Sequence, residues 1–128
     1  MTITAPVRAV VPAAELAGLL GLKPPTPEQA QVIESPLTPS VVVAGAGSGK
    51  TETMAARVLW LVANQLVAPD AVLGLTFTRK AAAELSQRIR RRLTQWRYVL
   101  ERERSSDPDR QAQLAQLLAG EPTVLTYS

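Results

Sequence analysis

The chain has 128 residues, of which 46% are hydrophobic, so it is long and apolar enough to form one domain with a buried core. It contains neither cysteine nor histidine, which excludes a disulfide framework, a zinc site built on thiolates or imidazoles, and histidine as a catalytic base. The net charge of +3 is uneven, because residues 79–110 hold ten basic and five acidic residues, and we expect any polyanion to bind this part of the chain.

Residues 1–22 are predicted to form a leader with one short helix, from Ala13 to Leu20. Prolines and charged residues interrupt its apolar stretch, so it does not resemble a signal peptide. No apolar run in the chain reaches the roughly 18 residues of a membrane span. We therefore expect a cytoplasmic protein without a membrane partner. After this leader a helix start is predicted, with Thr26 as N-cap, Pro27 at the first helical position and Gln29 able to complete a capping box.

A buried strand, a glycine-rich turn and a helix are predicted in the stretch SVVVAGAGSGKTETMAARV, residues 40–58. Small residues in the turn let backbone N–H groups surround phosphate oxygens, and the following helix adds its positive dipole end. Lys50 is expected to reach the outer phosphates, and the Thr51 hydroxyl is expected to bind Mg²⁺. The helix is predicted to place one apolar face on Met54, Val58, Leu61 and Val62.

The turn therefore predicts a site for a nucleoside triphosphate with Mg²⁺. In the strict form of the motif a glycine stands five residues before Gly49, whereas this chain has Ala44. The residues expected to hold the nucleotide phosphates are Ala44, Gly45, Ala46, Gly47, Ser48, Gly49, Lys50 and Thr51. Lys50 and Thr51 are also the residues expected to take part in catalysis.

A second strand is predicted at AVLGLTF, residues 71–77, and a long helix from about Arg79 to Arg104 follows it. One apolar stripe of this helix recurs at spacings of four, four, three and four, at Leu85, Ile89, Leu93, Trp96 and Leu100. A run of arginines is expected to form a solvated face, with Glu84 pairing with the first of them: Arg88, Arg90, Arg91 and Arg92. A short helix at residues 110–120 and a third strand at residues 122–128 complete a pattern that predicts an α/β fold with a parallel sheet.

The second strand ends in a phenylalanine between two threonines. The carboxyl end of a strand is where open α/β sheets bind ligands. Single-stranded nucleic acid binds to proteins through an aromatic platform with basic groups beside it. Phe77, followed by Arg79 and Lys80, supplies both.

Three stretches in this order, PPTPEQAQVIE, AGAGSGKT and LTFTRKAAAEL, resemble the opening of superfamily I DNA helicases of the UvrD, PcrA and Rep type. The resemblance implies that Gln29 recognises adenine and that Thr76, Phe77 and Thr78 contact single-stranded DNA. It also places Thr126 and Tyr127 in the next DNA motif. There the family usually has Thr-Phe-His, and Ser128 stands in place of the histidine.

Glu52 follows the Gly-Lys-Thr of the loop, where UvrD and PcrA tend to have arginine. In this respect the chain is similar to helicase–nuclease subunits of the RecB and AdnB type, and Glu52 is assigned to the nucleotide site with its neighbours.

The resemblance implies that residues 23–128 are the N-terminal part of a RecA-like phosphate-loop NTPase domain. The metal-binding acid and a second RecA-like domain would lie downstream. The whole protein would move 3′→5′ along single-stranded DNA with ATP, in repair or recombination, with a nuclease domain or subunit as a further partner. The chain alone is expected to be inactive. One alternative is a stand-alone nucleotide- or DNA-binding module. Another is a small phosphate-loop kinase, which is disfavoured because LTFTRKAAAEL would have no role in such an enzyme.

Overall fold

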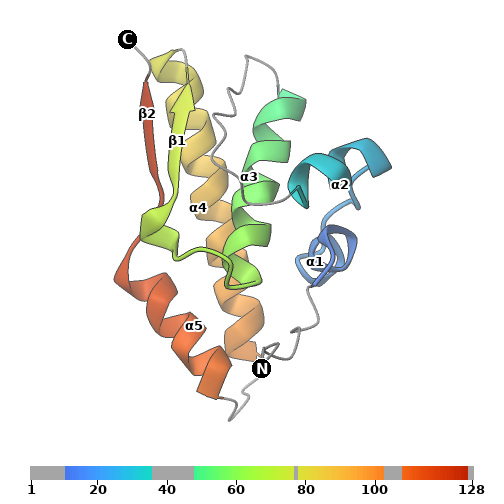
Figure 1. The fold of residues 1–128 in the computed structure, drawn as a ribbon, viewed down its shortest axis with the longest axis vertical. Coiled ribbons are helices and arrows are strands. Elements are labelled where there is room, and N and C mark those ends of the chain that lie inside the picture. The colour runs from blue at the N-terminus through green and yellow to red at the C-terminus, as the bar shows by residue number, and fades with distance from the viewer. Residues whose placement is uncertain (1–10, 36–47, 77, 103–107, 127–128) are drawn as a thin grey trace, which may run out of the picture.

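The computed structural model describes residues 11–35, 48–76, 78–102 and 108–126. Its elements, in chain order, are α1 (Ala13–Leu19), α2 (Pro27–Ile33), α3 (Ser48–Ala63), the 3-10 turn η1 (Pro69–Ala71), β1 (Leu73–Thr76), α4 (Arg79–Arg102), α5 (Pro108–Ala119) and β2 (Thr123–Thr126) (Figure 1). The described part is therefore mostly helical, with two short strands.

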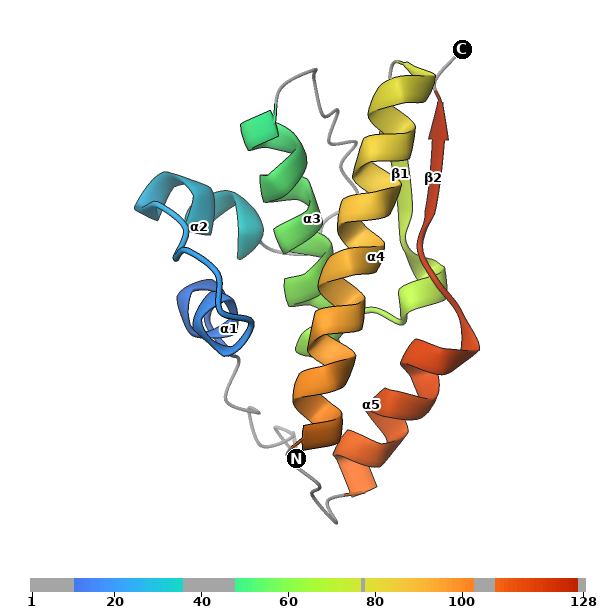
Figure 2. The ribbon, with the colours of Figure 1, turned by 180° about the vertical axis from the view of Figure 1, so that it is seen from behind.

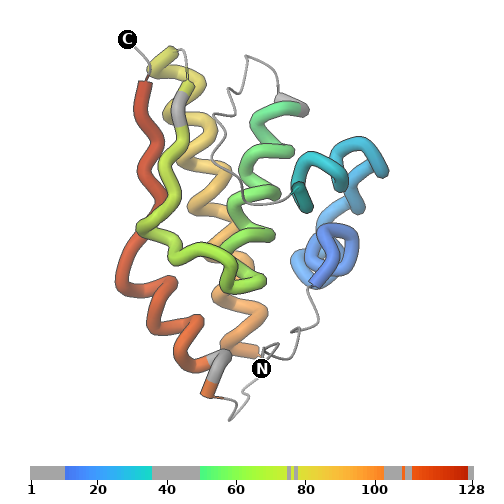
Figure 3. The backbone as a smooth tube through the Cα atoms, in the orientation of Figure 1, coloured from blue at the N-terminus to red at the C-terminus, as the bar shows by residue number. Residues whose placement is uncertain are grey.

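The two strands pair in parallel, in a register that runs from Leu73 opposite Thr123 to Thr76 opposite Thr126. This pairing confirms the second and third predicted strands and their parallel direction. The first predicted strand, residues 40–44, lies outside the described residues. Both described strands end at the same end of the molecule (Figure 3).

The long helix α4 covers one face of the strand pair, and α3 packs beside α4 (Figures 1 and 2). Helices α1 and α2 lie against the side of α3 that is away from the strands, and α5 lies at the opposite end of the molecule from the strand ends. The other face of the strand pair carries Leu73 and Leu125, residues that remain 60% and 49% exposed.

The core lies between α4, α3 and the two N-terminal helices. The predicted stripe of α4 is buried throughout, at Leu85, Ile89, Leu93, Trp96 and Leu100. All four residues of the apolar face predicted for α3 lie in this core or pack against it, but the buried surface of α3 is wider than predicted. Met54 and Val58 are partly buried, whereas Ala55, Leu59 and the run from Trp60 to Ala63 are buried. The reason is that α3 has neighbours on several sides, so more than one of its faces is covered.

Two side chains fasten the ends of helices by donating to backbone carbonyls. Arg57 of α3 donates from Nη1 to the carbonyls of Val32 at 3.2 Å, Ile33 at 3.0 Å and Ser35 at 3.0 Å, which anchors the C-terminal end of α2 on α3. Gln113 of α5 is buried and donates from Nε2 to the last carbonyls of α3. Its acceptors are Val62 O at 3.2 Å and Ala63 O at 2.7 Å. None of the described helices is long and apolar enough to cross a membrane.

Candidate functional site

The candidate site residues gather at one end of the molecule. The carboxyl ends of β1 and β2 and the N-terminal ends of α3 and α4 all lie at this end (Figure 1). Parallel α/β sheets bind their ligands beyond the carboxyl ends of the strands, and helix N-termini attract anions. The arrangement therefore suits a phosphate-bearing ligand.

The described part of the phosphate loop is the first turn of α3, which begins at Ser48. Lys50 is exposed in this turn, and Thr51 beside it is 5% exposed. Residues 44–47 of the predicted loop lie outside the described residues. An exposed lysine next to a buried threonine at a helix N-terminus fits a triphosphate and its Mg²⁺.

Gln29 forms the capping box that its spacing from Thr26 predicts. Its Oε1 accepts from the backbone N–H of Thr26 at 3.0 Å, and its own N–H donates to Thr26 Oγ1 at 3.2 Å. Within the described residues, Nε2 of the same amide makes no hydrogen bond. The cap therefore occupies the carbonyl oxygen of the amide but not its amino group.

Gln29 also lines an open cavity of about 370 Å³ that is bordered by α1, the segment before α2, and helices α2, α3 and α4. Leu16, Ile33 and Leu59 form apolar walls, and the polar groups around it include Glu52 and Arg92. Apolar cavities with a few placed polar groups are typical of sites for small flat ligands. Glu52 and Thr53, which follow Thr51 on α3, also line this cavity, so base and phosphate sites would be neighbours.

The carboxylate of Glu52 binds two arginines of α4, Arg88 and Arg92, which the sequence did not predict. Its Oε2 accepts from Arg88 Nη1 at 2.7 Å, and its Oε1 accepts from Arg92 Nε at 2.9 Å and from Arg92 Nη2. The expected pairing of Arg88 with Glu84 is therefore wrong. The expected solvated face is confirmed for Arg90 and Arg91, which are exposed, but not for Arg92. Arg92 has only 12% of its side chain exposed, and Arg90 pairs with Glu121.

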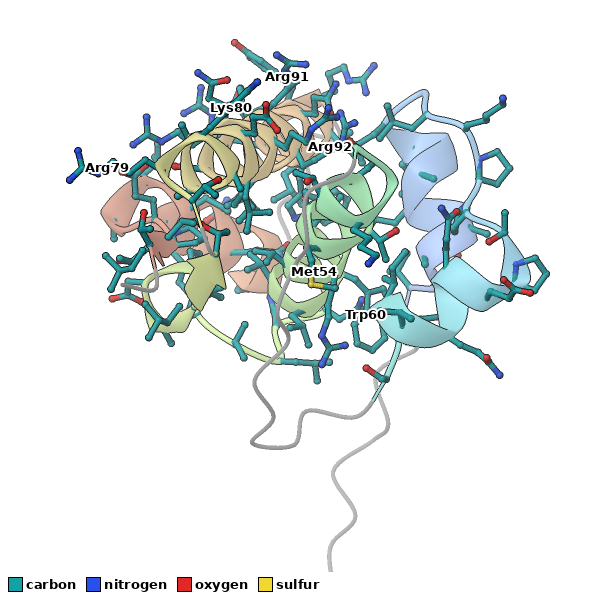
Figure 4. The ribbon with its side chains drawn as sticks, turned by 90° about the horizontal axis from the view of Figure 1, so that it is seen from above. Met54, Trp60, Arg79, Lys80, Arg91 and Arg92 are labelled. Atoms are coloured by element: carbon teal, nitrogen blue, oxygen red, sulfur yellow. The ribbon has the colours of Figure 1, made fainter. Side chains whose placement is uncertain are left out.

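Burial would raise the pKa of Glu52, but the hydrogen bonds and charges of Arg92 and Arg88 outweigh it, so the pKa lies below the usual 4.5. Arg88 and Arg92 are the residues whose role the sequence interpretation missed. A signal for them exists, because each directly precedes a residue of the buried stripe and so borders the core. Figure 4 shows Arg92 on the side of α4 toward α3, whereas Arg79, Lys80 and Arg91 project away from the helices.

The candidate DNA residues lie where the strands meet the start of α4. Thr76 is 1% exposed, and its hydroxyl donates to the carbonyl of Thr78 at 3.1 Å. The Thr78 hydroxyl accepts from the N–H of Ala81 at 3.0 Å and so caps α4. Thr126 lies opposite Thr76 in the sheet register.

These two hydroxyls therefore shape the turn into α4, and beyond it the side chains of Arg79 and Lys80 are exposed. Phe77 and Tyr127 lie outside the described residues. DNA contact by all seven predicted residues stays a prediction.

A glycine-rich sequence before a helix and a candidate DNA motif at a strand end, on a scaffold of helices and a parallel strand pair, are the combination expected of a nucleic-acid motor. Residues 25–126 match the family model described as the UvrD/REP helicase N-terminal domain, and the chain belongs to this family. The match confirms the resemblance to UvrD-type helicases.

Three curated proteins show the same relation. The chain is 45% identical over 65 residues to the ATP-dependent DNA helicase UvrD1 of Mycobacterium leprae, a match that covers 51% of this chain and 8% of that protein. It is 46% identical over 70 residues to DNA helicase IV of Escherichia coli, a match that covers 55% of this chain and 10% of that protein. It is 42% identical over 71 residues to the ATP-dependent DNA helicase PcrA of Bacillus subtilis, a match that covers 56% of this chain and 9% of that protein. The chain thus matches a tenth or less of the length of each of these relatives.

Proposed function

We propose that the chain is the ATP-binding N-terminal part of an ATP-dependent DNA helicase that acts on single-stranded DNA. The observation that carries this proposal is the common location of two motifs. Lys50 and Thr51 occupy the first turn of α3, and the DNA motif occupies the end of β1 and the start of α4 at the same end of the molecule.

In this proposal the fold is that of a RecA-like phosphate-loop NTPase. The backbone of residues 44–49 and Lys50 hold the phosphates of ATP, and the Thr51 hydroxyl ligates Mg²⁺. The Nε2 of Gln29 donates to the adenine, and the cavity beside it accepts the base. Glu52 contributes to this site through its position after Thr51.

Single-stranded DNA binds across the strand ends. The ring of Phe77 stacks on a base, while Arg79 and Lys80 neutralise phosphates. Thr76, Thr78, Thr126 and Tyr127 complete the contact surface. The whole protein then moves 3′→5′ along the strand in DNA repair or recombination.

Hydrolysis requires groups that we assign to other parts of the motor. A second RecA-like domain supplies an arginine finger, and losing such a finger removes on the order of 10³–10⁵ in rate in related enzymes. A nuclease subunit or domain is a further partner, which the resemblance at Glu52 supports. We therefore expect no DNA-stimulated release of phosphate from the chain alone. Turnover that rises with DNA and disappears in Lys50→Ala would contradict this division of labour.

A pair of matched lysine variants tests the proposed binding functions. Lys50→Ala should abolish Mg²⁺-dependent binding of a fluorescent ATP analogue and leave the circular dichroism spectrum unchanged. Lys80→Ala should keep ATP binding and instead reduce the salt dependence of oligonucleotide binding, because one phosphate contact is lost. Unchanged nucleotide affinity in Lys50→Ala would refute the nucleotide site.

A further inference from the structure

Helices α3 and α4 are joined by a cluster of three charged side chains, Glu52, Arg88 and Arg92, which we call the arginine clamp. Both carboxylate oxygens of Glu52 are engaged, one by each arginine. Arg92 is fixed further by the side chain of Gln95, whose Oε1 accepts from Nη1 at 3.0 Å. The clamp therefore holds one carboxylate in a single orientation between two helices.

The clamp differs from an ordinary surface ion pair. Arg92 donates to Glu52 from two nitrogens, and only 12% of its side chain is exposed. The pair between Arg90 and Glu121, on the same helix, has 63% and 61% of its side chains exposed. Exposed pairs are screened by water and contribute little. Removing one partner from a partly buried pair leaves an uncompensated charge. Without its carboxylate, the clamp would leave two guanidinium groups without their shared acceptor.

The position of the clamp connects the two candidate sites. Glu52 is next to Thr51 and two residues from Lys50, at the N-terminal end of α3. Arg88 and Arg92 are one turn apart on α4, nine and thirteen residues after Arg79, which begins the helix and belongs to the candidate DNA motif. Helices α3 and α4 also pack against one another more extensively than any other pair of elements.

We propose that Glu52 is a positioning residue which, through Arg88 and Arg92, fixes the first turn of α3 relative to α4, so that nucleotide binding and DNA binding are energetically coupled. This inference rests on the proposed function of the two sites. A displacement of α4 on binding DNA then moves the carboxylate and, with it, Lys50 and Thr51. Coupling between two sites is reciprocal, so it is measurable from either ligand.

The test uses the whole chain, a fluorescent ATP analogue with Mg²⁺, and an oligothymidylate. The quantity measured is the ratio of nucleotide dissociation constants with and without saturating oligonucleotide. In the unmodified chain we expect this ratio to depart from one by about 5-fold or more, as in typical coupled sites. In Glu52→Gln it should fall toward one, and nucleotide affinity without DNA should weaken as well.

Two further variants separate positioning from folding. Arg90→Gln removes the exposed pair on the same helix and should keep the ratio of the unmodified chain. Arg92→Lys keeps the charge but loses the two-pronged contact with Glu52. This variant should bring the ratio closer to one, and it remains a test even if Glu52→Gln fails to fold. A purely structural clamp would change melting temperature in these variants without changing the ratio.

These measurements distinguish failure of the positioning role of Glu52 from failure of the proposed ATP and DNA binding. If Lys50→Ala abolishes nucleotide binding but Glu52→Gln and Arg92→Lys keep the full ratio, the two sites are real and the positioning role is wrong. A ratio of one in the unmodified chain likewise overturns the inference. If the unmodified chain binds neither ligand, the proposed function fails, and the inference fails with it.

Discussion

The two roles assigned to Gln29 can be separated by changing one atom. Gln29→Glu keeps an oxygen where Oε1 accepts from Thr26, and glutamate is as acceptable as glutamine at this position of a capping box. It replaces the Nε2 donor with a second oxygen. We expect the stability of the variant to be unchanged, while its contact with adenine is lost.

The expected size of the loss follows from one hydrogen bond. A net contribution of about 0.5–1.5 kcal/mol corresponds to a roughly 2- to 12-fold weaker affinity for ATP, at about 1.4 kcal/mol per decade. Inorganic tripolyphosphate has no base, and the relative affinity of the variant for ATP over tripolyphosphate should fall by the same factor. Competition against a fluorescent ATP analogue measures both affinities.

Thr26→Ala is the complementary variant. It removes the hydroxyl that caps α2 and should cost about 0.5–2 kcal/mol of stability, with the Gln29 amide still present. Thermal unfolding should show the cost, and the preference for ATP over tripolyphosphate should survive. If Gln29→Glu retains the full preference for ATP, the amide is a helix cap alone and the adenine assignment is wrong.

Three other predictions concern α5, the clamp and the DNA motif. Gln113→Ala should lower the free energy of unfolding by about 1–3 kcal/mol in a urea melt, because the Ala63 carbonyl loses the Gln113 donor, while the Val62 carbonyl keeps the N–H of Gln65; a melt like that of the unmodified chain would contradict this. The pKa of Glu52 is lowered, so the stability from the clamp is complete above about pH 4.5 and is lost as the pH falls through the lowered value. The melting temperatures of the unmodified chain and Glu52→Gln should therefore converge in acid, and a constant difference would refute the assignment. Phe77→Ala should weaken oligonucleotide binding roughly 5- to 150-fold by fluorescence anisotropy, and equal affinities would remove the ring from the DNA site.

Features set by neighbours in the sequence were predictable. The stripe of α4 follows from apolar residues at helical spacing, and all five of its predicted members are buried. The capping box follows from Thr26 and Gln29 standing three residues apart. In both cases the physical cause acts within one or a few helical turns, so a single segment contains all the information needed.

Features set by distant partners were not predictable in the same way. The rule for residues four apart pairs Arg88 with Glu84, but the observed partner, Glu52, is 36 residues away. Gln113 likewise binds carbonyls about 50 residues earlier. The burial of several faces of α3 depends on α1, α2 and α4 arriving from separate segments. Such contacts are decided by the three-dimensional packing of helices, which periodicity along one helix does not encode.

The leucine-bearing face of the strand pair has a practical consequence for work with the purified chain. Parallel sheets are normally covered on both faces, whereas Leu73 and Leu125 here face solvent. Exposed apolar strands are prone to stick to one another. We expect the chain to self-associate reversibly at high concentration, to bind hydrophobic dyes while fully folded, and to stay monodisperse longer when both leucines are replaced by threonine.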